Sequence, residues 1–553
     1  MNRKSLLLIL SAIILLLSTF SFGAIPAQER EALIALYNAT NGDEWVNNSN
    51  WKGVNNDIDG FSETGSEGLW AGITVVDDHV TRIEFWGNNL DGFVPTELSN
   101  LSYLKVLMLG SSGGGKIIGT IPIELGNLSN LETLTLSGNQ LSGSIPVELG
   151  NLISLQYLSL PSNQLTGTIP SSLANLANLK GLTLFQNKLS GCIPFELGAL
   201  NKLEVLWLQY NQLDGSIPPE IGNMSNLESL CLYSNKLSGQ IPRTLGKLSN
   251  LQSLKLYQNQ LTGQIPKSLG NLEKLKTLWL STNPLGGKIP AELSKLSNLE
   301  ILWLDSNGLT GTIPPELGNL SKLRYLYLSG NKLEGNIPPE LGNLMKLERL
   351  SLGSNPLTGK IPAELGNLFN LQIFVLIYTQ ISGSIPPELG NLLSVHYLAL
   401  SHNLLSGEIP VSLMNLSNLQ SRGLNIEYNC LYTNNPVLNA WLQIVNPNWD
   451  IHQSNCDTPL QIFTLAIEST HGQGAEISVF PADLDGNLDG FTNFERIYQE
   501  GTSVILTAPS THHQNGKVFS HWKIDGKNQV NTLSVEILMD VDHKVKAYYC
   551  EAK

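Results

Sequence analysis

The sequence contains few charged residues and fewer basic than acidic ones. Only 14% of its 553 residues are charged, and 33 Lys and Arg against 47 Asp and Glu leave a formal net charge of −14. Such a balance repels polyanions and anionic membrane surfaces at long range. It therefore argues against a nucleic-acid partner and against a polybasic membrane anchor.

Cysteine is scarce as well, and none of the five cysteines precedes Cys192. Cys192 and Cys231 fall in different parts of a repeated motif described below, so we expect them to lie on different sides of the fold. Cys430 and Cys456 bracket the segment after the last motif, where they either form a disulfide or stay reduced. An exported chain with so few cysteines is stabilised mainly by its core.

Long apolar runs are absent except at the N-terminus. There Arg3 and Lys4 precede an apolar stretch at 6–17, and small residues stand before Ala24. This order is typical of a secretory signal peptide over residues 1–23. An uncleaved anchor is the alternative, although the run is shorter than the roughly 20 residues that span a membrane. We expect a mature chain without a membrane span, either secreted or held at the cell surface.

No combination of side chains suggests catalysis or a cofactor. Carboxylates recur at one position of a repeated turn, for example Glu316 and Glu340. A regular row of this kind is typical of a solvated ridge rather than of a paired acid and base. The sequence therefore predicts neither an enzyme nor a cofactor.

One segment has a weak metal signature. Asp485, Asn487 and Asp489 have the spacing that opens a calcium loop. Arg496 stands where the closing bidentate Glu is expected, so a polar hairpin loop is the alternative.

What the chain has in abundance is a repeat of 24 residues. Residues 131–146 read LETLTLSGNQLSGSIP, and the pattern LxxLxLxxNxLxGxIPxxLGNLxx recurs along most of the chain. A period of roughly 20–29 residues with this leucine spacing is the signature of a leucine-rich repeat. Only Thr379 interrupts the Asn series, whose members are Asn139, Asn163, Asn187, Asn211, Asn235, Asn259, Asn283, Asn307, Asn331, Asn355 and Asn403.

Each part of the motif has a physical reading. Leu134 and Leu136 alternate at period two, so both point inward from a short strand. Asn139 ends the strand, and its amide can bond backbone groups of neighbouring coils. The Gly and Pro of GxIP then turn the chain away. Stacked coils form a leucine-rich repeat solenoid of the α/β type, with a parallel sheet on its concave face. We count fifteen strands, from near Ile83 to near Leu424.

Several stretches carry a family resemblance. ALIALYNATNGDEWVNNSNW followed by LWAGITVVDDHVTRIEF resembles the N-terminal cap of plant-type leucine-rich repeat proteins, and LxGxIPxxLGNL resembles their GxIP repeat subtype. The paired cap cysteines, kinase domain and transmembrane helix of the plant receptors are missing. The chain is therefore more similar to exported bacterial proteins with plant-type repeats. Its segment YNCLYTNNPVLNAWL resembles the C-terminal cap of those proteins. FSHWKIDG and MDVDHKVKAYY resemble divergent β-repeat domains of bacterial surface proteins. The resemblance implies a fold more strongly than a function.

These patterns divide the chain into five parts. Residues 1–23 are the signal peptide, 24–92 the N-terminal cap with the first repeat strand, and 93–429 the repeats. Residues 430–458 form a C-terminal cap, and 459–553 a small all-β domain with alternating strand patterns. Trp45, Trp51 and Trp70 are expected in the core of the N-terminal cap, because the end of a solenoid needs covering.

Side chains that point outward from the strands are free of packing constraints. Four residues before the ladder Asn, the central repeats carry Trp or Tyr where outer repeats carry Thr or Ser. Exposed aromatic patches indicate recognition, and Trp, Tyr and Arg dominate hot spots. Mutual stacking along the sheet is the alternative. The predicted ligand site comprises Phe185, Trp207, Tyr210, Tyr233, Tyr257, Trp279, Trp303, Asp305, Tyr325, Tyr327, Arg349 and Tyr378.

From this site we expect a secreted or cell-surface binding protein that holds an extracellular protein or peptide on the concave face. Glycan binding by the same aromatic rings is one alternative, and a structural spacer without a specific ligand is another. Resemblance to the plant polygalacturonase-inhibiting proteins adds an extracellular enzyme as a candidate partner.

Overall fold

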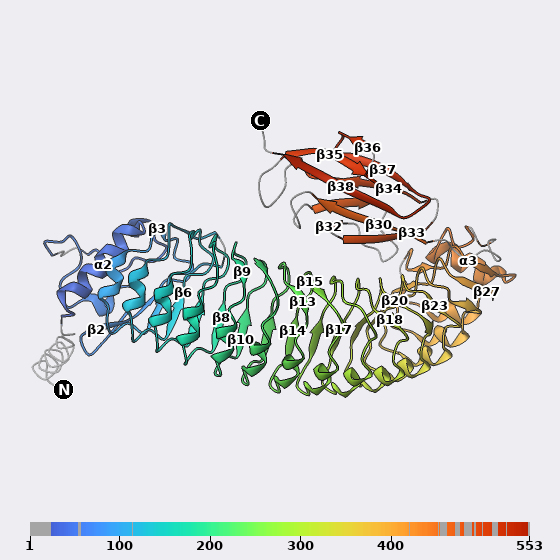
Figure 1. The fold of residues 1–553 in the computed structure, drawn as a ribbon, viewed down its shortest axis with the longest axis horizontal. Helices are drawn as coiled ribbons and strands as arrows, with labels where there is room; N and C mark the ends of the chain where they lie inside the picture. The colour runs from blue at the N-terminus through green and yellow to red at the C-terminus, as the bar shows by residue number, and fades with distance from the viewer. Residues whose placement is uncertain are drawn as a thin grey trace, which may run out of the picture. The chain divides into compact units, whose positions relative to one another are not determined.

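The computed structural model describes residues 24–53, 57–112, 114–419, 421–451, 453, 462–469, 476–480, 489–491, 494–499, 502–510, 518–526 and 528–550 (Figure 1). The predicted signal peptide, residues 1–23, lies outside these ranges. The chain divides into two compact units, residues 1–251 and 252–553, which are described separately. Within the described ranges, no helix is long and apolar enough to cross a membrane.

The repeats each contribute one short strand to a sheet of sixteen strands, in the order β1-β2-β4-β6-β7-β8-β10-β12-β14-β16-β17-β19-β22-β24-β26-β28. Only β1 is antiparallel to its neighbour, so the fifteen predicted repeat strands are confirmed. The strands are β1 Ile73–Val76, β2 His79–Glu84, β4 Val106–Met108, β6 Thr133–Thr135, β7 Tyr157–Ser159, β8 Gly181–Thr183, β10 Val205–Trp207 and β12 Ser229–Cys231 in the first unit, and β14 Ser253–Lys255, β16 Thr277–Trp279, β17 Ile301–Trp303, β19 Tyr325–Tyr327, β22 Arg349–Ser351, β24 Ile373–Val375, β26 Tyr397–Ala399 and β28 Leu424–Asn425 in the second.

The leucines of the motif build the core, as predicted. Leu134 and Leu136 of the first unit have no exposed surface, and the same is true of the equivalent Leu302 and Leu304 in the second unit. In β17 the central Leu302 points inward while the flanking Ile301 and Trp303 are half-exposed. Each strand therefore has one buried side and one outward side. We call the outward side the strand face.

Asparagine side chains tie neighbouring coils together. The Asn331 amide nitrogen donates to Leu304 O at 3.0 Å, Leu328 O at 3.0 Å and Ser329 O at 3.2 Å. Its Oδ1 accepts from the backbone N–H of Leu309 at 3.1 Å. Because one side chain serves backbone groups of two coils, the predicted asparagine ladder is confirmed at this position.

Replacing Asn331 with Ala is expected to destabilise the second unit by about 2–4 kcal/mol, because it leaves the buried N–H of Leu309 without an acceptor and removes a donor from three carbonyls. Asn298 provides the control, because its amide donates to Glu273 O at 2.8 Å in an exposed hydrogen bond. Asn298→Ala should cost less than about 1 kcal/mol. Denaturant unfolding followed by circular dichroism measures both; equal effects would contradict the ladder's role.

Thr379 shows how the ladder adapts to its one exception. Its hydroxyl donates to Asn403 Oδ1 and accepts the N–H of Ile381 at 3.3 Å. The shorter side chain does not serve the preceding coil, and the N–H of Leu357 there bonds Asn355 O at 2.7 Å instead. Where Thr379 replaces the ladder Asn, the N–H of Leu357 in the preceding coil is therefore satisfied by a backbone carbonyl of its own coil.

Gly and the Ile-Pro pair of the motif determine the backbone conformation on the turn side of each coil. Gly311 has φ +75°, a conformation that other residues adopt only with strain. Pro314 then precedes a 3-10 turn, and a Cβ at Gly318 in that turn would lie 2.2 Å from Glu340 O of the next coil. A side chain at Gly318 would therefore require the next coil to shift, although Ala174 and Ser294 stand at the equivalent position of other coils. The 3-10 helices are η1 Gly42–Glu44, η2 Glu67–Leu69, η3 Thr96–Asn100, η4 Ile123–Asn127, η5 Val147–Asn151, η6 Ser171–Asn175, η7 Phe195–Ala199, η8 Pro219–Asn223, η9 Arg243–Lys247, η10 Lys267–Asn271, η11 Ala291–Lys295, η12 Pro315–Asn319, η13 Pro339–Asn343, η14 Ala363–Asn367, η15 Pro387–Asn391 and η16 Val411–Asn415.

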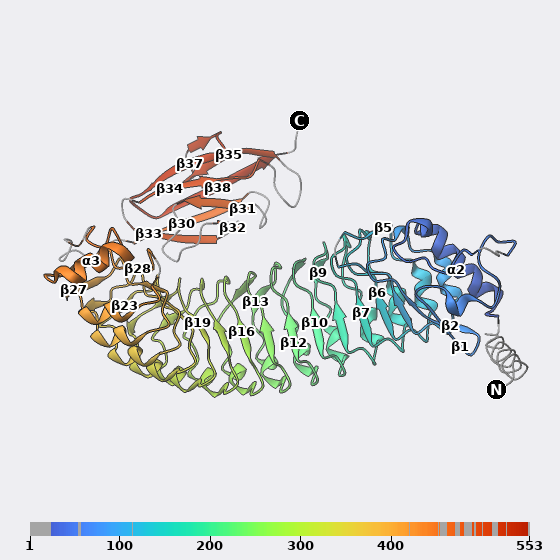
Figure 2. The same cartoon turned by 180° about the vertical axis from the view of Figure 1, so that it is seen from behind.

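Short parallel strands also form just before the Ile-Pro turns, where the sequence predicted turns alone. Residue pairs such as Gln212↔Ser190 set their register. Figure 2 shows these strands and the main sheet from behind. They are β3 Asp91–Phe93, β5 Lys116–Ile118, β9 Ser190–Cys192, β11 Gln212–Asp214, β13 Ser238–Gln240, β15 Gln260–Thr262, β18 Thr310–Gly311, β20 Lys332–Leu333, β21 Gly335–Asn336, β23 Leu357–Thr358, β25 Ser382–Gly383, β27 Leu404–Glu408 and β29 Cys430–Tyr432.

The N-terminal cap is built on helix α2, Ala27–Ala39. Trp51 and Trp70 are almost completely buried and Trp45 nearly so, which confirms their predicted place in the core. Trp51 and Trp70 lie 4.6 Å apart between ring centroids. Arg30 of α2 is also buried and pairs with acidic residues of the following loop.

The C-terminal cap contains helix α3, Pro436–Val445, which begins where Asn435 Oδ1 accepts the N–H groups of Val437 and Leu438. Cys430 is disulfide-bonded. Its predicted partner, Cys456, lies outside the described residues, so the pairing stays a prediction. Cys192 and Cys231 are not disulfide-bonded.

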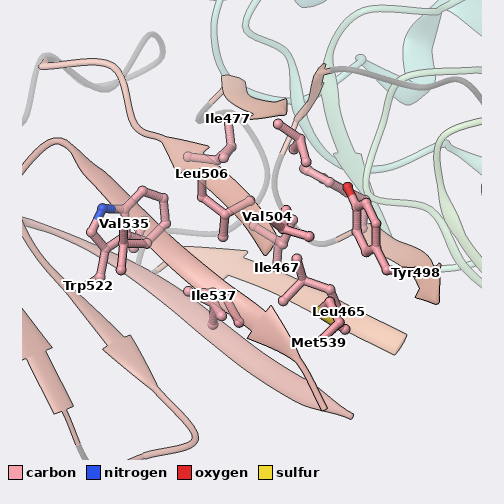
Figure 3. Packing of buried hydrophobic residues seen from close by; sticks show 14 of the residues in the cluster. Leu465, Ile467, Ile477, Tyr498, Val504, Leu506, Trp522, Val535, Ile537 and Met539 are labelled. Atoms are coloured by element: carbon pink, nitrogen blue, oxygen red, sulfur yellow. The ribbon is translucent and has the colours of Figure 1, made fainter. Parts of the chain in front are cut away.

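The described residues beyond 461 form two packed sheets, one ordered β33-β30-β38-β35-β36 and the other β32-β31-β34-β37. The second sheet is antiparallel, whereas the first is mixed, because β30 and β38 pair in parallel. Apolar side chains of the two sheets point toward one another, among them Leu465, Val504 and Trp522 (Figure 3). The predicted small β domain is therefore present. Its strands are β30 Ile462–Ser469, β31 Glu476–Phe480, β32 Asp489–Phe491, β33 Phe494–Gln499, β34 Thr502–Thr507, β35 Val518–Ile524, β36 Asn528–Val530, β37 Ser534–Met539 and β38 His543–Cys550.

Candidate functional site

Parallel pairing sets the spacing of side chains on the strand face. Trp279, Trp303 and Tyr327 are register partners on β16, β17 and β19. Neighbouring strands in a sheet lie about 4.8 Å apart, a little more than the thickness of an aromatic ring. Rings at the same position of successive coils are therefore placed to stack face to face.

Four rings of the second unit form a stack, which we call the aromatic stack: Tyr257, Trp279, Trp303 and Tyr327. The last three are register partners, whereas Tyr257 lies two residues beyond Lys255, the register partner of Trp279. Successive ring centroids are 3.9, 4.2 and 4.3 Å apart, and the ring planes are inclined by only 19°, 5° and 23°. All four side chains are half-buried. Each of the central rings, Trp279 and Trp303, has a neighbouring ring on both faces, so what it presents outward is its edge.

The two central indoles differ in their hydrogen bonding. The N–H of Trp279 donates to the hydroxyl of Ser281 in the same coil. The N–H of Trp303 is buried and has no acceptor among the described residues. An unsatisfied buried donor costs about 1–3 kcal/mol. Asp305 follows on the same face, where its Oδ2 accepts a 3.4 Å hydrogen bond from the Ser306 hydroxyl.

A charged group lies beside the stack. Arg324 Nε donates to Glu348 Oε1 at 2.6 Å, and the Tyr325 hydroxyl donates to Glu348 Oε2 at 3.1 Å. The hydrogen bond from Arg324 lowers the pKa of Glu348. Burial raises the pKa of Tyr325, and the hydrogen bond to Glu348 raises it further.

Arg349 differs from Arg324 in its contacts. Its guanidinium lies 5.9 Å from the centroid of the Tyr325 ring, within cation–π range. Its side chain is exposed and makes no hydrogen bond or ion pair with the described residues of the chain. Arg349 is paired in register with Tyr325 on β19, two residues before Tyr327 of the aromatic stack, and its charge also acts on Glu348.

Other predicted aromatics, in the first unit, meet edge to face. Phe185 and Trp207 lie 6.1 Å apart with ring planes at 60°, and Tyr210 and Tyr233 lie 5.2 Å apart at 79°. The Trp207 N–H donates to the Ser229 hydroxyl at 2.9 Å. These edge contacts do not continue the face-to-face pattern of the aromatic stack.

Tyr378 was predicted to be exposed, and this prediction is wrong. Only 9% of its surface is accessible. Its ring stacks on His402 at 3.9 Å, which stacks on Tyr428 at 4.1 Å. All three directly precede a ladder position and have φ between +52° and +55°. Tyr210 has the same φ of +55° and is 48% exposed, so the turn does not explain the burial of Tyr378. Leucine spacing carries no signal for the ring contacts and packing that bury it.

The structure also contains two open polar grooves that the sequence did not predict. Both are lined by residues seven and nine positions before the ladder, at the entrance to each strand. One, of about 360 Å³, is lined by Glu132, Ser154, Gln156, Asn178, Lys180 and Lys202. The other, of about 280 Å³, is lined by Arg324, Lys346, Glu348, Asn370, Gln372 and Ser394.

Most of the predicted calcium loop lies outside the described residues. Asp485 and Asn487 lie outside the described residues, and Asp489 begins β32. In the described part of the chain, no group of three or more His, Cys, Asp or Glu side chains is arranged to hold a metal ion.

Family models match the repeats. The model described as a leucine-rich repeat region matches residues 146–286 and 257–376, and the Leucine Rich Repeat model matches residues 130–152 and 394–416. No curated protein sequence matches the chain significantly.

Solved structures give closer parallels. A plant peptide hormone receptor, RGFR1 in complex with RGF2, is 33% identical with a TM-score of 0.57, and the match covers 62% of each chain. A TDR receptor is 32% identical with a TM-score of 0.58, covering 63% of this chain and 64% of the receptor. The match thus spans less than two thirds of either receptor chain.

A leucine-rich repeat protein of Leptospira interrogans is 31% identical with a TM-score of 0.53. The match covers 67% of this chain and 94% of the Leptospira protein. Near-complete coverage at this identity, together with the repeat models and the stacked coils, settles the family. The chain belongs to the leucine-rich repeat proteins.

Proposed function

We propose that this protein is a secreted or cell-surface binding protein that holds a peptide, or an extended segment of another protein, against the strand face of its second unit. The single observation that carries the proposal is the aromatic stack, four half-buried rings in nearly parallel planes. Nothing in the repeat core requires them, because the leucines of the same strands already fill it.

Mutual stacking holds the rings in one conformation before any ligand arrives. A preorganised surface loses little side-chain entropy on binding, and Trp and Tyr are enriched among hot-spot residues. The row of ring edges gives an apolar ridge for a chain lying across the strands. Arg349 beside it offers a charged partner for a carboxylate of the ligand.

Ring geometry favours a peptide over a glycan. Stacking on a sugar requires a free ring face, whereas both faces of Trp279 and Trp303 are covered by neighbouring rings. A peptide can contact ring edges and fill the spaces between neighbouring side chains. The match to a plant receptor described as binding a peptide hormone is consistent with this choice.

Export is part of the same proposal. The basic start and apolar stretch of residues 1–23 support a signal peptide. The resemblance of the GxIP repeats and of the C-terminal β domain to those of exported bacterial proteins supports export.

A peptide selection tests the proposal. The full mature chain is used to select from a displayed library of random linear peptides, and in parallel is applied to a glycan array. We expect enriched peptides that bind the wild type and Phe369→Ala but not Trp303→Ala. Phe369 is a suitable control because it is an exposed aromatic residue outside the strand rows. Selected peptides that bind Trp303→Ala unchanged, or glycan binding that requires Trp303, would overturn it.

A further inference from the structure

The strand face changes character beyond Arg349. In the coil of β22 the outward residues are Arg349, Ser351 and Gly353, whereas in the next coil they are Ile373, Val375 and Ile377. An outward strand surface made only of aliphatic side chains is unfavourable in water, at about 25 cal/mol for each Å² exposed. Such a surface indicates a partner.

These side chains are covered. Ile377 is 9% exposed, Tyr378 9% and Ala399 fully buried. Together with Val375, which packs partly buried against them, we call these residues the aliphatic patch. By contrast, Met345 and Phe369 lie outside the strand rows and are 50% and 56% exposed. Burial is therefore specific to the strand face here.

The cover comes from the C-terminal β domain. Ile377, Tyr378 and Ala399 belong to one continuous cluster of buried side chains with Leu465 and Tyr498 of that domain. The partly buried Phe463 and Ile497 pack against the same cluster. Burial also raises the pKa of Tyr397, the register partner of Ile373.

We propose that the C-terminal domain is a built-in occupant of the strand face, docked on the aliphatic patch. It leaves the aromatic stack and Arg349 open and closes the coils that follow them. The docking stands on the contacts just described. Its consequence, that the domain sets the C-terminal limit of the ligand site, rests on the proposed function. A ligand that extends past Arg349 must then displace the domain.

Hydroxyl-radical footprinting of the full chain tests the docking without any ligand. In the wild type, Tyr378 should be oxidised about fivefold more slowly than Tyr157, in line with exposures of 9% and 45%. Ile377→Asp places a charge in the patch and should release the domain, so that Tyr378 oxidation rises severalfold. The radius of gyration from X-ray scattering should increase in the same variant.

Two further variants complete the test. Val375→Asp should reproduce the release from a different position, which keeps the test decisive if Ile377→Asp disrupts the coil. Phe369→Asp is the matched control, since it adds the same charge to an exposed site on the neighbouring coil, and should change neither readout. Wild-type rates of Tyr378 and Tyr157 that are equal, or folded patch variants with unchanged scattering and protection, would overturn the proposal. Either outcome leaves the peptide-binding proposal untouched.

Discussion

Replacing Arg30 with Ala should lower the free energy of unfolding of the N-terminal cap by about 3–5 kcal/mol, the range found when one partner of a buried ion pair is removed. Arg30 Nε donates to Asp59 Oδ2 at 2.8 Å, its Nη1 donates to Glu67, and its Nη2 donates to Ser62 O at 2.7 Å. Glu67 is 1% exposed, so without Arg30 its charge would stay buried and unpaired.

A surface pair provides the control for this prediction. Arg82 Nε lies 2.9 Å from Glu84 Oε2, but both side chains are exposed. Arg82→Ala should therefore cost less than about 1 kcal/mol. Denaturant unfolding followed by tryptophan fluorescence measures both variants, and Trp45, Trp51 and Trp70 in the core of the cap contribute three of the chain's ten tryptophans to the signal. A cost for Arg30→Ala no larger than for Arg82→Ala would contradict the account of the cap.

The same network gives the cap an acid sensitivity. The hydrogen bond from Arg30 lowers the pKa of Asp59, and hydrogen bonds from Thr64 lower the pKa of Asp57. Carboxyls with depressed pKa values contribute stability above their unfolded pKa, near 4, and lose it as the pH falls further. The difference between wild type and Arg30→Ala should therefore shrink below about pH 4.

The second large effect concerns binding. Substituting both Trp279 and Trp303 with Ala should weaken a selected peptide by about 3 kcal/mol, or roughly 100-fold in Kd, because hot-spot aromatics cost 2 kcal/mol or more each and are not additive. The loss should appear mainly in the dissociation rate. Isothermal titration with the folded variant measures it.

Stability must be separated from affinity in that experiment. Losing a stacked ring also removes about 0.5–1.5 kcal/mol of ring contact within the protein. Circular dichroism of the double variant should therefore show an intact fold with a lowered midpoint. A Kd within twofold of the wild type would remove the stack from the binding site.

Most of the repeat architecture was predictable from the sequence because one physical constraint recurs. The leucine alternation of residues 131–136 requires inward side chains, and the Asn at 139 requires backbone partners in adjacent coils. Together they determine the strand, its register and the stacking direction. The short strands before Ile-Pro were not predicted, because residues such as Ser190 and Gln212 carry no alternating apolar pattern.

The candidate site was predictable only in part. The outward row that contains Trp279 and Trp303 follows from period-two alternation. The inclination of the rings, the buried N–H of Trp303 and the position of Arg349 depend on packing between coils. Tyr378 was predicted to be exposed because the repeat pattern does not show that its ring stacks on His402 and joins a buried cluster with residues of the C-terminal domain. The cover over Ile377 depends on a domain separated from it by about 90 residues of sequence, beyond the reach of any local pattern.

The central claim is that the aromatic stack is where the ligand lies. Hydroxyl-radical footprinting of the full chain, with and without a saturating selected peptide, tests it most directly. The account predicts that Tyr257, Trp279, Trp303 and Tyr327 become protected while Phe369 is oxidised at an unchanged rate. Unchanged oxidation of all four rings, with protection elsewhere on the chain, would contradict it.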